Sequence, residues 1–410
     1  MPEVYYPDQS KQLIDLVQWA NAHKTPLAVR GGNSKAGVGR PVAAEHIVDM
    51  SRLNGVRDYN PVELVLTAGA GTPLEDIEKV LADKGQMLAF EPPAYALNEA
   101  ADGRTTLGGV LAANASGPRR FYSGAARDHF LGFKAVNGRG EAFKSGGQVV
   151  KNVTGFDVSK LMAGSWGTLA ILYEVTLKVI PAAKKTRTLL VFGQNPEHAR
   201  RTLTAAASSP HGVSGAAYLA GDLARRSGVS LINEMQDNTP VTALRIEGPA
   251  ESLEHRLKAL TTVVCNSYAT SATTVELPSS HSQTLWREIG NLSLLKGSGQ
   301  PILWRLSLPP GEMSTTLHRL QALGIDNWQV DQAGGAVWLA CGATVSADKI
   351  RNALGRSRGH ATLWQAPASM RAEVDVFQPQ SAALKSLTRR VKNSFDPNGI
   401  LNPRRMYRDI

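Results

Sequence analysis

Hydrophobic and polar positions in the first 182 residues alternate in a way that predicts a mixed chain of helices and strands. Apolar residues recur at helical spacing over 10–23, where Leu13, Leu16 and Val17 begin the stripe. Short apolar segments predict strands at 27–29, 47–50 and 64–68. A second helix is expected to start at Thr72, because Pro73 suits the first helical position and Glu75 would complete a capping box.

The end of this region has a β pattern. An Asn-Gly-Arg-Gly turn at 137–140 separates two β-type segments, 133–136 and 141–144, and so predicts a hairpin. Residues 169–179 are again β-rich, and Pro181 closes the segment. We therefore expect a first domain over 1–182.

The middle of the chain, 183–368, contains two successive runs with the order strand, helix, strand, strand, helix, strand. The predicted strands include 188–192, 213–219, 241–247, 302–308, 328–331, 336–341 and 362–365. The predicted helices are 196–207, 252–261, 313–323 and 347–354, and Asn195 is expected to cap the first of them. This order is ferredoxin-like. We expect both runs to share one antiparallel sheet, covered on one face by helices.

The last segment, 369–410, predicts one amphipathic helix and a tail. Over 382–395 the apolar residues Leu384, Leu387, Val391 and Phe395 fall on one helical face. An Asp-Pro-Asn-Gly turn follows the helix.

Composition narrows the class of protein. The net charge is +10 and the pI is about 9.6, but no basic tract with interleaved aromatics predicts nucleic-acid binding. A partner-docking face, a preference for membrane surfaces and a merely solvated basic surface all stay open. No apolar run reaches 18 residues, and the N-terminus does not resemble a signal peptide. The two cysteines, far apart in sequence, are expected to be free buried thiols in a reducing compartment.

Three polar, glycine-rich loops follow or precede apolar segments, at 29–39, 105–117 and 151–168. Glycine lets backbone N–H groups approach a ligand, and such groups commonly bind pyrophosphate. The spacings G-x-G-x-x-G after a strand, G-x-x-x-x-G-K-[ST] and G-x-S-x-G are absent. The loops therefore predict a long ligand lying across one domain.

These loops also carry a resemblance. The segments RGGNS (30–34), TLGGVLAANASGPRR (106–120), VKNVTGFDVSKLMAGSWGTLAIL (150–172) and FDPNGILNPRRM (395–406) resemble the FAD-binding family of vanillyl-alcohol oxidase and p-cresol methylhydroxylase (PCMH). Within it they are most similar to the FAD-binding subunits of bacterial glycolate oxidases. The resemblance implies an α+β fold: a two-lobed PCMH-type FAD domain, a ferredoxin-like cap domain, and a C-terminal segment that returns to the flavin.

The resemblance also implies which residues contact FAD. They are Arg30, Gly31, Gly32, Asn33, Ser34, Thr106, Gly108, Gly109, Asn114, Ala115, Ser116, Gly117, Lys151, Asn152, Val153, Thr154, Gly167, Ile171 and Asn402. Relatives with covalent flavin often have histidine where this chain has Asn33. An amide cannot make that bond, so we expect noncovalent FAD. Lys151 is a candidate for stabilising the anionic reduced ring. Arg119 and Arg120 are open between phosphate, an anionic partner and solvent.

No catalytic residue is assigned. Hydroxy-acid relatives carry a metal-binding histidine cluster in the cap, whereas the nine histidines here are dispersed, and no metal site is expected. They are His23, His46, His129, His198, His211, His255, His281, His318 and His360. This dispersion argues against an independent hydroxy-acid site.

The resemblance implies instead a subunit of an enzyme that oxidises glycolate, with D-lactate as a further candidate substrate, to the oxo acid. Its partners would be a second flavin subunit and an iron–sulfur subunit, since two cysteines cannot hold a [4Fe–4S] cluster. A self-sufficient FAD-dependent 2-hydroxy-acid dehydrogenase and a structural subunit without functional flavin are the alternatives. We expect a cytoplasmic location, with association at the inner face of the cytoplasmic membrane through partners left open.

Overall fold

The computed structural model describes residues 2–94, 103–147, 155–234, 238–267, 273–296, 299–356 and 359–410. The chain folds into two compact units. The first contains Met1–Ser116, Gly124–Ala182 and Ala368–Ile410, and the second contains Gly117–Ser123 and Ala183–Pro367. The second unit thus includes a short segment, 117–123, from within the region that the sequence assigns to the first domain.

One lobe of the first unit is a three-stranded parallel sheet with the order β1-β3-β2. Its strands are β1 (Glu3–Tyr5), β2 (Leu27–Arg30) and β3 (His46–Asp49), and the 3-10 helix η1 (Met50–Arg52) follows directly. Helix α1 (Ser10–His23) has the predicted bounds and buries Leu13, Val17 and Ala20. These side chains share one core with Ile400 and Leu401 of the C-terminal tail.

The other lobe is a five-stranded antiparallel sheet with the order β4-β5-β9-β7-β8. Its strands are β4 (Val56–Asn60), β5 (Val65–Gly69), β7 (Phe130–Asn137), β8 (Ala142–Gly146) and β9 (Ala170–Lys178). The expected hairpin is confirmed, because β7 pairs antiparallel with β8. The remaining elements of this lobe are α2 (Leu74–Ala82), α3 (Leu107–Ala113), α5 (Ala126–His129), α6 (Val158–Met162) and the paired short strands β6 (Gln86–Met87) and β10 (Ile180–Pro181).

The expected capping box at Thr72 is wrong. Pro73 is the residue that precedes α2, and no side chain caps the helix. The Thr72 hydroxyl instead donates to the Gly69 carbonyl oxygen (2.7 Å) and accepts from the Gly55 N–H (2.8 Å). It therefore joins two turns next to β5.

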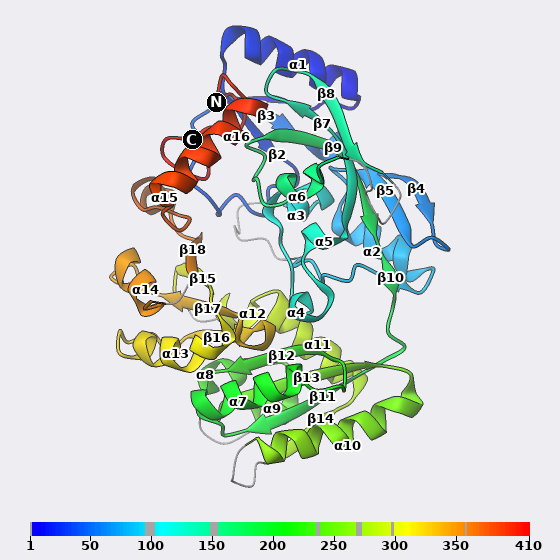
Figure 1. The fold of residues 1–410 in the computed structure, drawn as a ribbon, viewed down its shortest axis with the longest axis vertical. Helices are drawn as coiled ribbons and strands as arrows, with labels where there is room; N and C mark the ends of the chain where they lie inside the picture. The colour runs from blue at the N-terminus through cyan, green and yellow to red at the C-terminus, as the bar shows by residue number, and fades with distance from the viewer. Residues whose placement is uncertain are drawn as a thin grey trace. The chain divides into compact units, whose positions relative to one another are not determined.

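The C-terminal segment returns to the first unit, where α16 (Ala382–Phe395, red) lies near β2 and β3 (blue) in Figure 1. Leu401 forms a parallel bridge with Leu27 of β2. The expected apolar face of α16 is only partly correct, since Leu384 and Leu387 are about half exposed. The helix buries Lys392 instead, and its ammonium donates to Asp396 (2.6 Å), the Thr168 carbonyl (2.6 Å) and the Leu401 carbonyl (3.1 Å). A short helix, α15 (Ala368–Glu373), precedes α16.

The second unit is built on an eight-stranded antiparallel sheet with the order β14-β11-β13-β12-β16-β17-β15-β18. Its strands are β11 (Lys185–Phe192), β12 (Val213–Leu219), β13 (Val241–Gly248), β14 (Thr274–Leu277), β15 (Ile302–Ser307), β16 (Trp328–Asp331), β17 (Ala336–Cys341) and β18 (His360–Gln365). Each half has the ferredoxin-like strand order, and the halves join through β12 and β16. The single antiparallel sheet is therefore confirmed.

The helices of this unit cover both faces of the sheet, so the expectation of one covered face is wrong. Trp286 of α11 donates from Nε1 to Thr188 Oγ1 of β11 (2.9 Å), and Thr188 pairs with Arg245 of β13. Thr242, three residues from Arg245, points to the opposite face. There it bonds to Gln194, which also holds Thr202 of α7.

The helices of the second unit are α4 (Arg120–Ser123), α7 (Pro196–Ala207), α8 (Gly221–Ala224), α9 (Ser230–Asn233), α10 (Ala250–Asn266), α11 (Ser279–Gly290), α12 (Ser293–Lys296), α13 (Met313–Gln321) and α14 (Ala347–Ala353). The 3-10 helices are η2 (Pro310–Glu312) and η3 (Gln332–Gly334). The predicted cap of α7 is confirmed, since Asn195 accepts from the His198 N–H (2.9 Å).

Two further expectations concern the whole chain. Among the residues described, no helix is both long and apolar enough to cross a bilayer. Both cysteines are free, but Cys265 is exposed and only Cys341 is buried, so the expectation of two buried thiols is wrong for Cys265.

Candidate functional site

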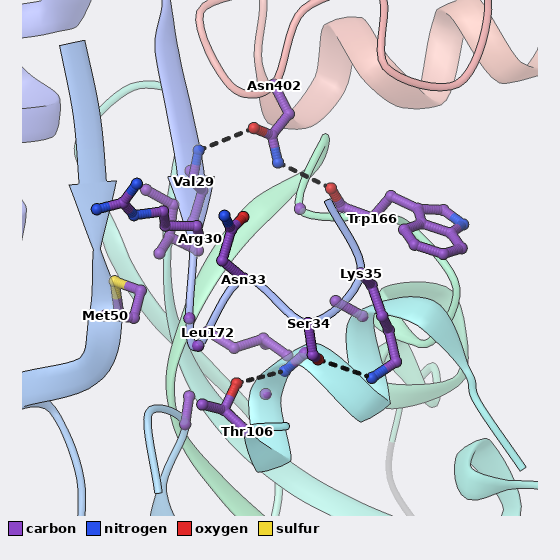
Figure 2. Close-up of a pocket in the computed structure, with 18 of the residues that line it drawn as sticks. Val29, Arg30, Asn33, Ser34, Lys35, Met50, Thr106, Trp166, Leu172 and Asn402 are labelled. Carbon is purple, nitrogen blue, oxygen red and sulfur yellow. Dashed lines mark hydrogen bonds between the residues drawn. The ribbon is translucent and has the colours of Figure 1, made fainter. Parts of the chain in front are cut away.

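A pocket in the first unit brings together segments that are far apart in the sequence. Its empty volume is about 820 Å³, with its open mouth included. It is lined by the loop after β2, the start of α3, the segment before β9 and the C-terminal tail (Figure 2). The lining residues are Val29, Arg30, Gly31, Gly32, Asn33, Ser34, Lys35, Ala36, Met50, Ala70, Thr106, Gly108, Gly109, Ala112, Ser165, Trp166, Gly167, Ala170, Ile171, Leu172, Asn402 and Arg405.

The loop after β2 supplies unused backbone donors to this pocket. Within the described residues, the N–H groups of Gly32, Asn33, Ser34 and Lys35 donate no hydrogen bond. Asn33 has φ 60°, in the left-handed region, which asparagine tolerates better than most residues. Successive free N–H groups around such a turn are the donors that a phosphate requires.

Gly32 is required by the packing of this loop. A Cβ on Gly32 would lie 1.8 Å from the carbonyl oxygen of Arg104, and a Cβ on Gly31 would lie 2.3 Å from Thr106 Oγ1. Both contacts are far below van der Waals distance, so any side chain here would push the two loops apart. The glycines therefore allow the first loop to cross closely over the segment that leads into α3.

The start of α3 forms a wall of the pocket and supplies few donors. The N–H of Leu107 donates to the Thr72 carbonyl (2.9 Å), and that of Gly108 donates to the Ala70 carbonyl (2.7 Å). The Thr106 hydroxyl caps the helix by accepting from the Gly109 N–H (3.4 Å). Position 108 has no room for a side chain, because a Cβ added to Gly108 would lie 2.8 Å from the Ala70 methyl group.

Asn402 fastens two walls of the pocket to each other. Its Oδ1 accepts from the Val29 N–H (2.8 Å), and its Nδ2 donates to the Trp166 carbonyl (2.9 Å), as Figure 2 shows. Its own N–H donates to the Leu27 carbonyl (3.0 Å). Trp166 and Gly167 both have positive φ, 54° and 69°, so the segment turns sharply toward this amide. The tail thus holds β2 and the segment before β9 at a fixed separation.

The described part of the pocket carries positive charge. Three cations line it, and no Asp or Glu of the described residues is among its lining residues. Arg30 already forms an ion pair, because its Nε lies 2.8 Å from Asp49 Oδ2. Lys35 is 7% exposed, and its Nζ donates to Ser34 Oγ at 3.3 Å. Arg405 reaches the carbonyl oxygens of Lys35 (3.4 Å) and Val38 (3.5 Å).

Burial shifts the pKa values of these cations downward. Burial lowers the pKa of the Lys35 ammonium to about 8. Burial and the neighbouring charge of Arg371 lower the pKa of Arg405 to about 10. In both cases the largest cause is removal of a positive charge from water, which disfavours the charged form.

Eleven of the residues predicted from the sequence line this pocket together. They are Arg30, Gly31, Gly32, Asn33, Ser34, Thr106, Gly108, Gly109, Gly167, Ile171 and Asn402. Their contact with a ligand stays a prediction.

The other predicted residues lie elsewhere or outside the described residues. Asn114 accepts from the Arg127 N–H (3.0 Å), and Ser116 accepts from the Ala126 N–H (2.9 Å), so both side chains order the chain after α3. Ala115 packs in the core, and Gly117 belongs to the second unit. Lys151, Asn152, Val153 and Thr154 are outside the described residues. Flavin contact by this group stays a prediction.

Sequence reasoning missed two cations of the pocket that have no carboxylate partner among the described residues, the buried Lys35 and the partly buried Arg405. Lys35 directly follows the RGGNS segment, and Arg405 lies inside FDPNGILNPRRM, so both adjoin or belong to segments that carry the resemblance. Arg119, by contrast, lies in the second unit, where it is buried and donates from Nη2 to Glu247 Oε1 (2.7 Å). That ion pair accounts for Arg119 without a phosphate.

The pocket contains no constellation for metal chemistry. In the part of the chain that the structure describes, no group of three or more His, Cys, Asp or Glu residues could hold a metal ion. What the described pocket offers is a row of free N–H groups, one buried and one partly buried cation, and a wall of small residues. This combination fits an extended anion with a flat apolar part, such as a flavin dinucleotide.

Comparisons with known proteins agree with this geometry. Residues 2–146 match a family model described as FAD binding domain. The glycolate oxidase subunit GlcE of Escherichia coli is 32% identical over 403 residues, which are 98% of this chain and 99% of that protein. The glycolate oxidase subunit GlcD of Bacillus subtilis is 26% identical over 50% of this chain and 42% of its own length. The structure of 4-ethylphenol oxidase from Gulosibacter chungangensis shares the fold, with a TM-score of 0.72 over 99% of this chain and 89% of that one, at 13% identity.

Proposed function

The chain belongs to the FAD-binding family that includes the glycolate oxidase subunit GlcE, and from this membership we propose that it is the FAD-binding E-type subunit of a glycolate oxidase. The observation that carries the proposal is the pocket of the first unit, where four separate segments surround a space whose described lining residues offer free N–H donors and include no carboxylate. We propose that the predicted residues that line this pocket bind FAD, and that the FAD is noncovalent because Asn33 cannot attach to it.

The chain's own residues would hold and orient the cofactor. The loop 31–35 would bind the pyrophosphate through its backbone N–H groups, and the glycine-lined start of α3 would lie flat against the ligand. Asn402 would keep the two sides of the pocket at the right distance. When bound, FAD supplies the redox chemistry of the reaction. No residue of this chain is assigned as a base for the substrate.

The substrate and partners are proposed from the relatives. GlcE and GlcD are named as subunits of glycolate oxidase, so we propose that this chain works in a complex with a GlcD-like flavin subunit that oxidises glycolate. This chain has two cysteines, which are too few to hold a [4Fe–4S] cluster, so an iron–sulfur subunit would complete the assembly. We propose a cytoplasmic location, which suits the two free thiols.

The test is the visible spectrum of the purified chain, before and after acid precipitation. We expect a yellow protein that releases its flavin into the supernatant, as dissociable FAD requires. Colour retained in the pellet would refute the argument from Asn33, and a chain that binds no FAD would refute the proposal. Glycolate should bleach the flavin only after a GlcD-like subunit is added. Bleaching of the isolated chain would favour the self-sufficient dehydrogenase.

A matched pair of glycine variants tests the pocket itself. Gly32→Ala places a methyl group 1.8 Å from the Arg104 carbonyl, so we expect FAD affinity to fall by about 100-fold or more. Gly147→Ala is the control, because a Cβ there meets nothing within 4 Å. FAD titration monitored by fluorescence quenching gives both dissociation constants. Equal affinities would show that FAD binds elsewhere.

A further inference from the structure

Two cations of the pocket, the buried Lys35 and the partly buried Arg405, have no carboxylate partner among the described residues. Lys35 and Arg405 form no ion pair with any Asp or Glu of the described residues. The Lys35 ammonium has three hydrogens, and within the described ranges only Ser34 Oγ lies at hydrogen-bond distance from it. The Nε atom of Arg405 is buried, and no described residue accepts a hydrogen bond from it. Unpaired buried charges are costly, so their presence at one pocket indicates a missing anion.

We propose that Lys35 and Arg405 bind the negative charge of the FAD pyrophosphate, and that Lys35 completes its positive charge by taking up a proton when the cofactor enters. This inference rests on the proposed function, since it assumes that FAD occupies the pocket. It goes further by assigning the charge compensation to two side chains outside the glycine motif. Arg30 does not share this role, because Asp49 already pairs with it.

The geometry places both cations at one side of the first loop. Arg405 Nη2 lies 3.4 Å from the backbone oxygen of Lys35, and its guanidinium stands 5.6 Å from the Trp166 ring centroid. Figure 2 shows the Lys35 side chain running alongside Ser34, on the same loop whose N–H groups are free. A diphosphate at these N–H groups would meet one lysine and one arginine, which matches its two negative charges.

The surroundings of Lys35 decide its protonation. The charged groups on the elements packed around it are Arg405 on the tail, Arg371 of α15 beyond it, Arg30 with its partner Asp49, and Arg104, which faces Glu75 at 3.7 Å. Among the described residues these positive groups outnumber the two carboxylates, each of which already faces an arginine. Since burial lowers the pKa of Lys35 to about 8, a dianion arriving there would raise that pKa again.

The sign of the pH dependence follows. Below pH 8 the lysine is protonated both without and with FAD, so affinity is flat. Above pH 8 the free protein has lost this proton and must take it back on binding, so the dissociation constant should rise by about tenfold per pH unit. Proton uptake should be about one quarter of a proton per FAD at pH 7.5 and about three quarters at pH 8.5.

The experiment is FAD titration of the full chain between pH 7.0 and 9.2, for the wild type and for Lys35→Met, Lys35→Arg and Lys84→Met. Lys84 is an exposed lysine of the first unit, so Lys84→Met makes the same chemical change away from the pocket. We expect Lys35→Met to weaken FAD binding by about 10- to 100-fold at pH 7.5 and to lose the pH dependence. Lys35→Arg should bind FAD without pH dependence, and Lys84→Met should match the wild type.

Calorimetry of the wild type in two buffers of different ionisation enthalpy measures proton uptake without any variant. Riboflavin, which has the ring but no phosphate, should bind the wild type and Lys35→Met equally. A flat wild-type profile with no proton uptake, or a riboflavin deficit as large as the FAD deficit, would overturn the inference and leave FAD binding intact. A wild type that binds no FAD at any pH would instead refute the proposed function.

Discussion

Two buried arginines of the second unit share one carboxylate, whereas Lys35 and Arg405 at the pocket of the first unit have no carboxylate partner among the described residues. In the second unit, Arg119 and Arg245 are buried beside Glu247, which also accepts a hydrogen bond from Ser214. Burial alone would raise the pKa of Glu247, but the charges of Arg245 and Arg119 pull it below its usual value. In the first unit, Lys35 and Arg405 have no such partner among the described residues.

The difference separates structural charge from charge that awaits a ligand. An internally paired cluster is complete in the folded chain, and its loss should affect stability. An uncompensated cluster is unfavourable until an anion arrives, so its loss should affect binding and even favour the free protein. The first unit is able to pair charges internally, since Lys392 and Asp396 do so at the base of the tail. The lack of a charged partner is therefore specific to the cations Lys35 and Arg405 at the pocket.

Glu247→Gln should have the largest effect on stability. It leaves two buried arginines without their carboxylate, and we expect the free energy of unfolding to fall by about 3–5 kcal/mol. Urea denaturation followed by tryptophan fluorescence measures this, because Trp286, Trp304, Trp328, Trp338 and Trp364 all lie in the second unit. The control is Glu234→Gln at an exposed position of the same unit. Equal stability of the two variants would remove the distinction between the clusters.

Asp396→Asn should have a smaller effect. The Lys392 ammonium would lose its charged partner but keep the carbonyls of Thr168 and Leu401, so we expect a loss of about 2–3 kcal/mol. Burial lowers the pKa of Lys392 even with Asp396 beside it, so without Asp396 that pKa should fall further. The measurement is thermal unfolding of the first unit at pH 7 and at pH 9. A variant that is no less stable at pH 7 would contradict the pairing.

Lys35→Met should stabilise the free protein by about 1–3 kcal/mol at pH 7.5, the opposite sign. The folded pKa of Lys35, about 8, lies below the unfolded value. Between these values the unfolded chain holds a proton that the folded chain lacks, so raising the pH favours the folded wild type. The advantage of Lys35→Met should therefore shrink from pH 8 to about pH 10. Paired denaturation curves check this, and a constant difference would contradict it.

Asp15→Ala should have the smallest effect. Its partner is Lys11, at 2.7 Å on the exposed face of α1, and both side chains are more than half exposed. Water screens this pair, so we expect a change in stability within about 0.5 kcal/mol. Thermal unfolding in low and in high salt tests this. A loss similar to that of Asp396→Asn would mean that burial does not set the value of a charge pair here.

Much of the fold was predictable because local signals agree with tertiary packing. The bounds of α1 and α16, the cap of α7 and the strand order of the second unit all follow from periodicity and turn residues. Helix α11 was not predicted, and it covers the second face of the sheet. Apolar residues at helical spacing show that a helix has an apolar side, but they do not show which face of a sheet that side covers. The capping prediction for Thr72 was wrong for a similar reason. Its hydroxyl bonds to Gly55 and Gly69 in two turns and not to the first turn of the helix.

The site was predictable as a set of loops, but its electrostatics were not. Glycine runs and resemblance led to Gly31, Gly32 and Asn33. Lys35 and Arg405 look like ordinary basic residues in a chain of net charge +10, because the sequence does not reveal that Lys35 is buried and Arg405 partly buried. In α16 the reverse error occurred: the leucines Leu384 and Leu387 are exposed, and Lys392 is inside.

The clasp formed by Asn402 bears on the order in which the protein is made. The β2 wall of the pocket is synthesised early, near residue 29, but the amide that fixes it to the Trp166 segment comes more than two hundred residues after both. The glycine loops are therefore synthesised long before Asn402, the residue that holds them in place. We expect a nascent chain stalled before residue 402 to bind flavin poorly. FAD should therefore bind after translation is complete.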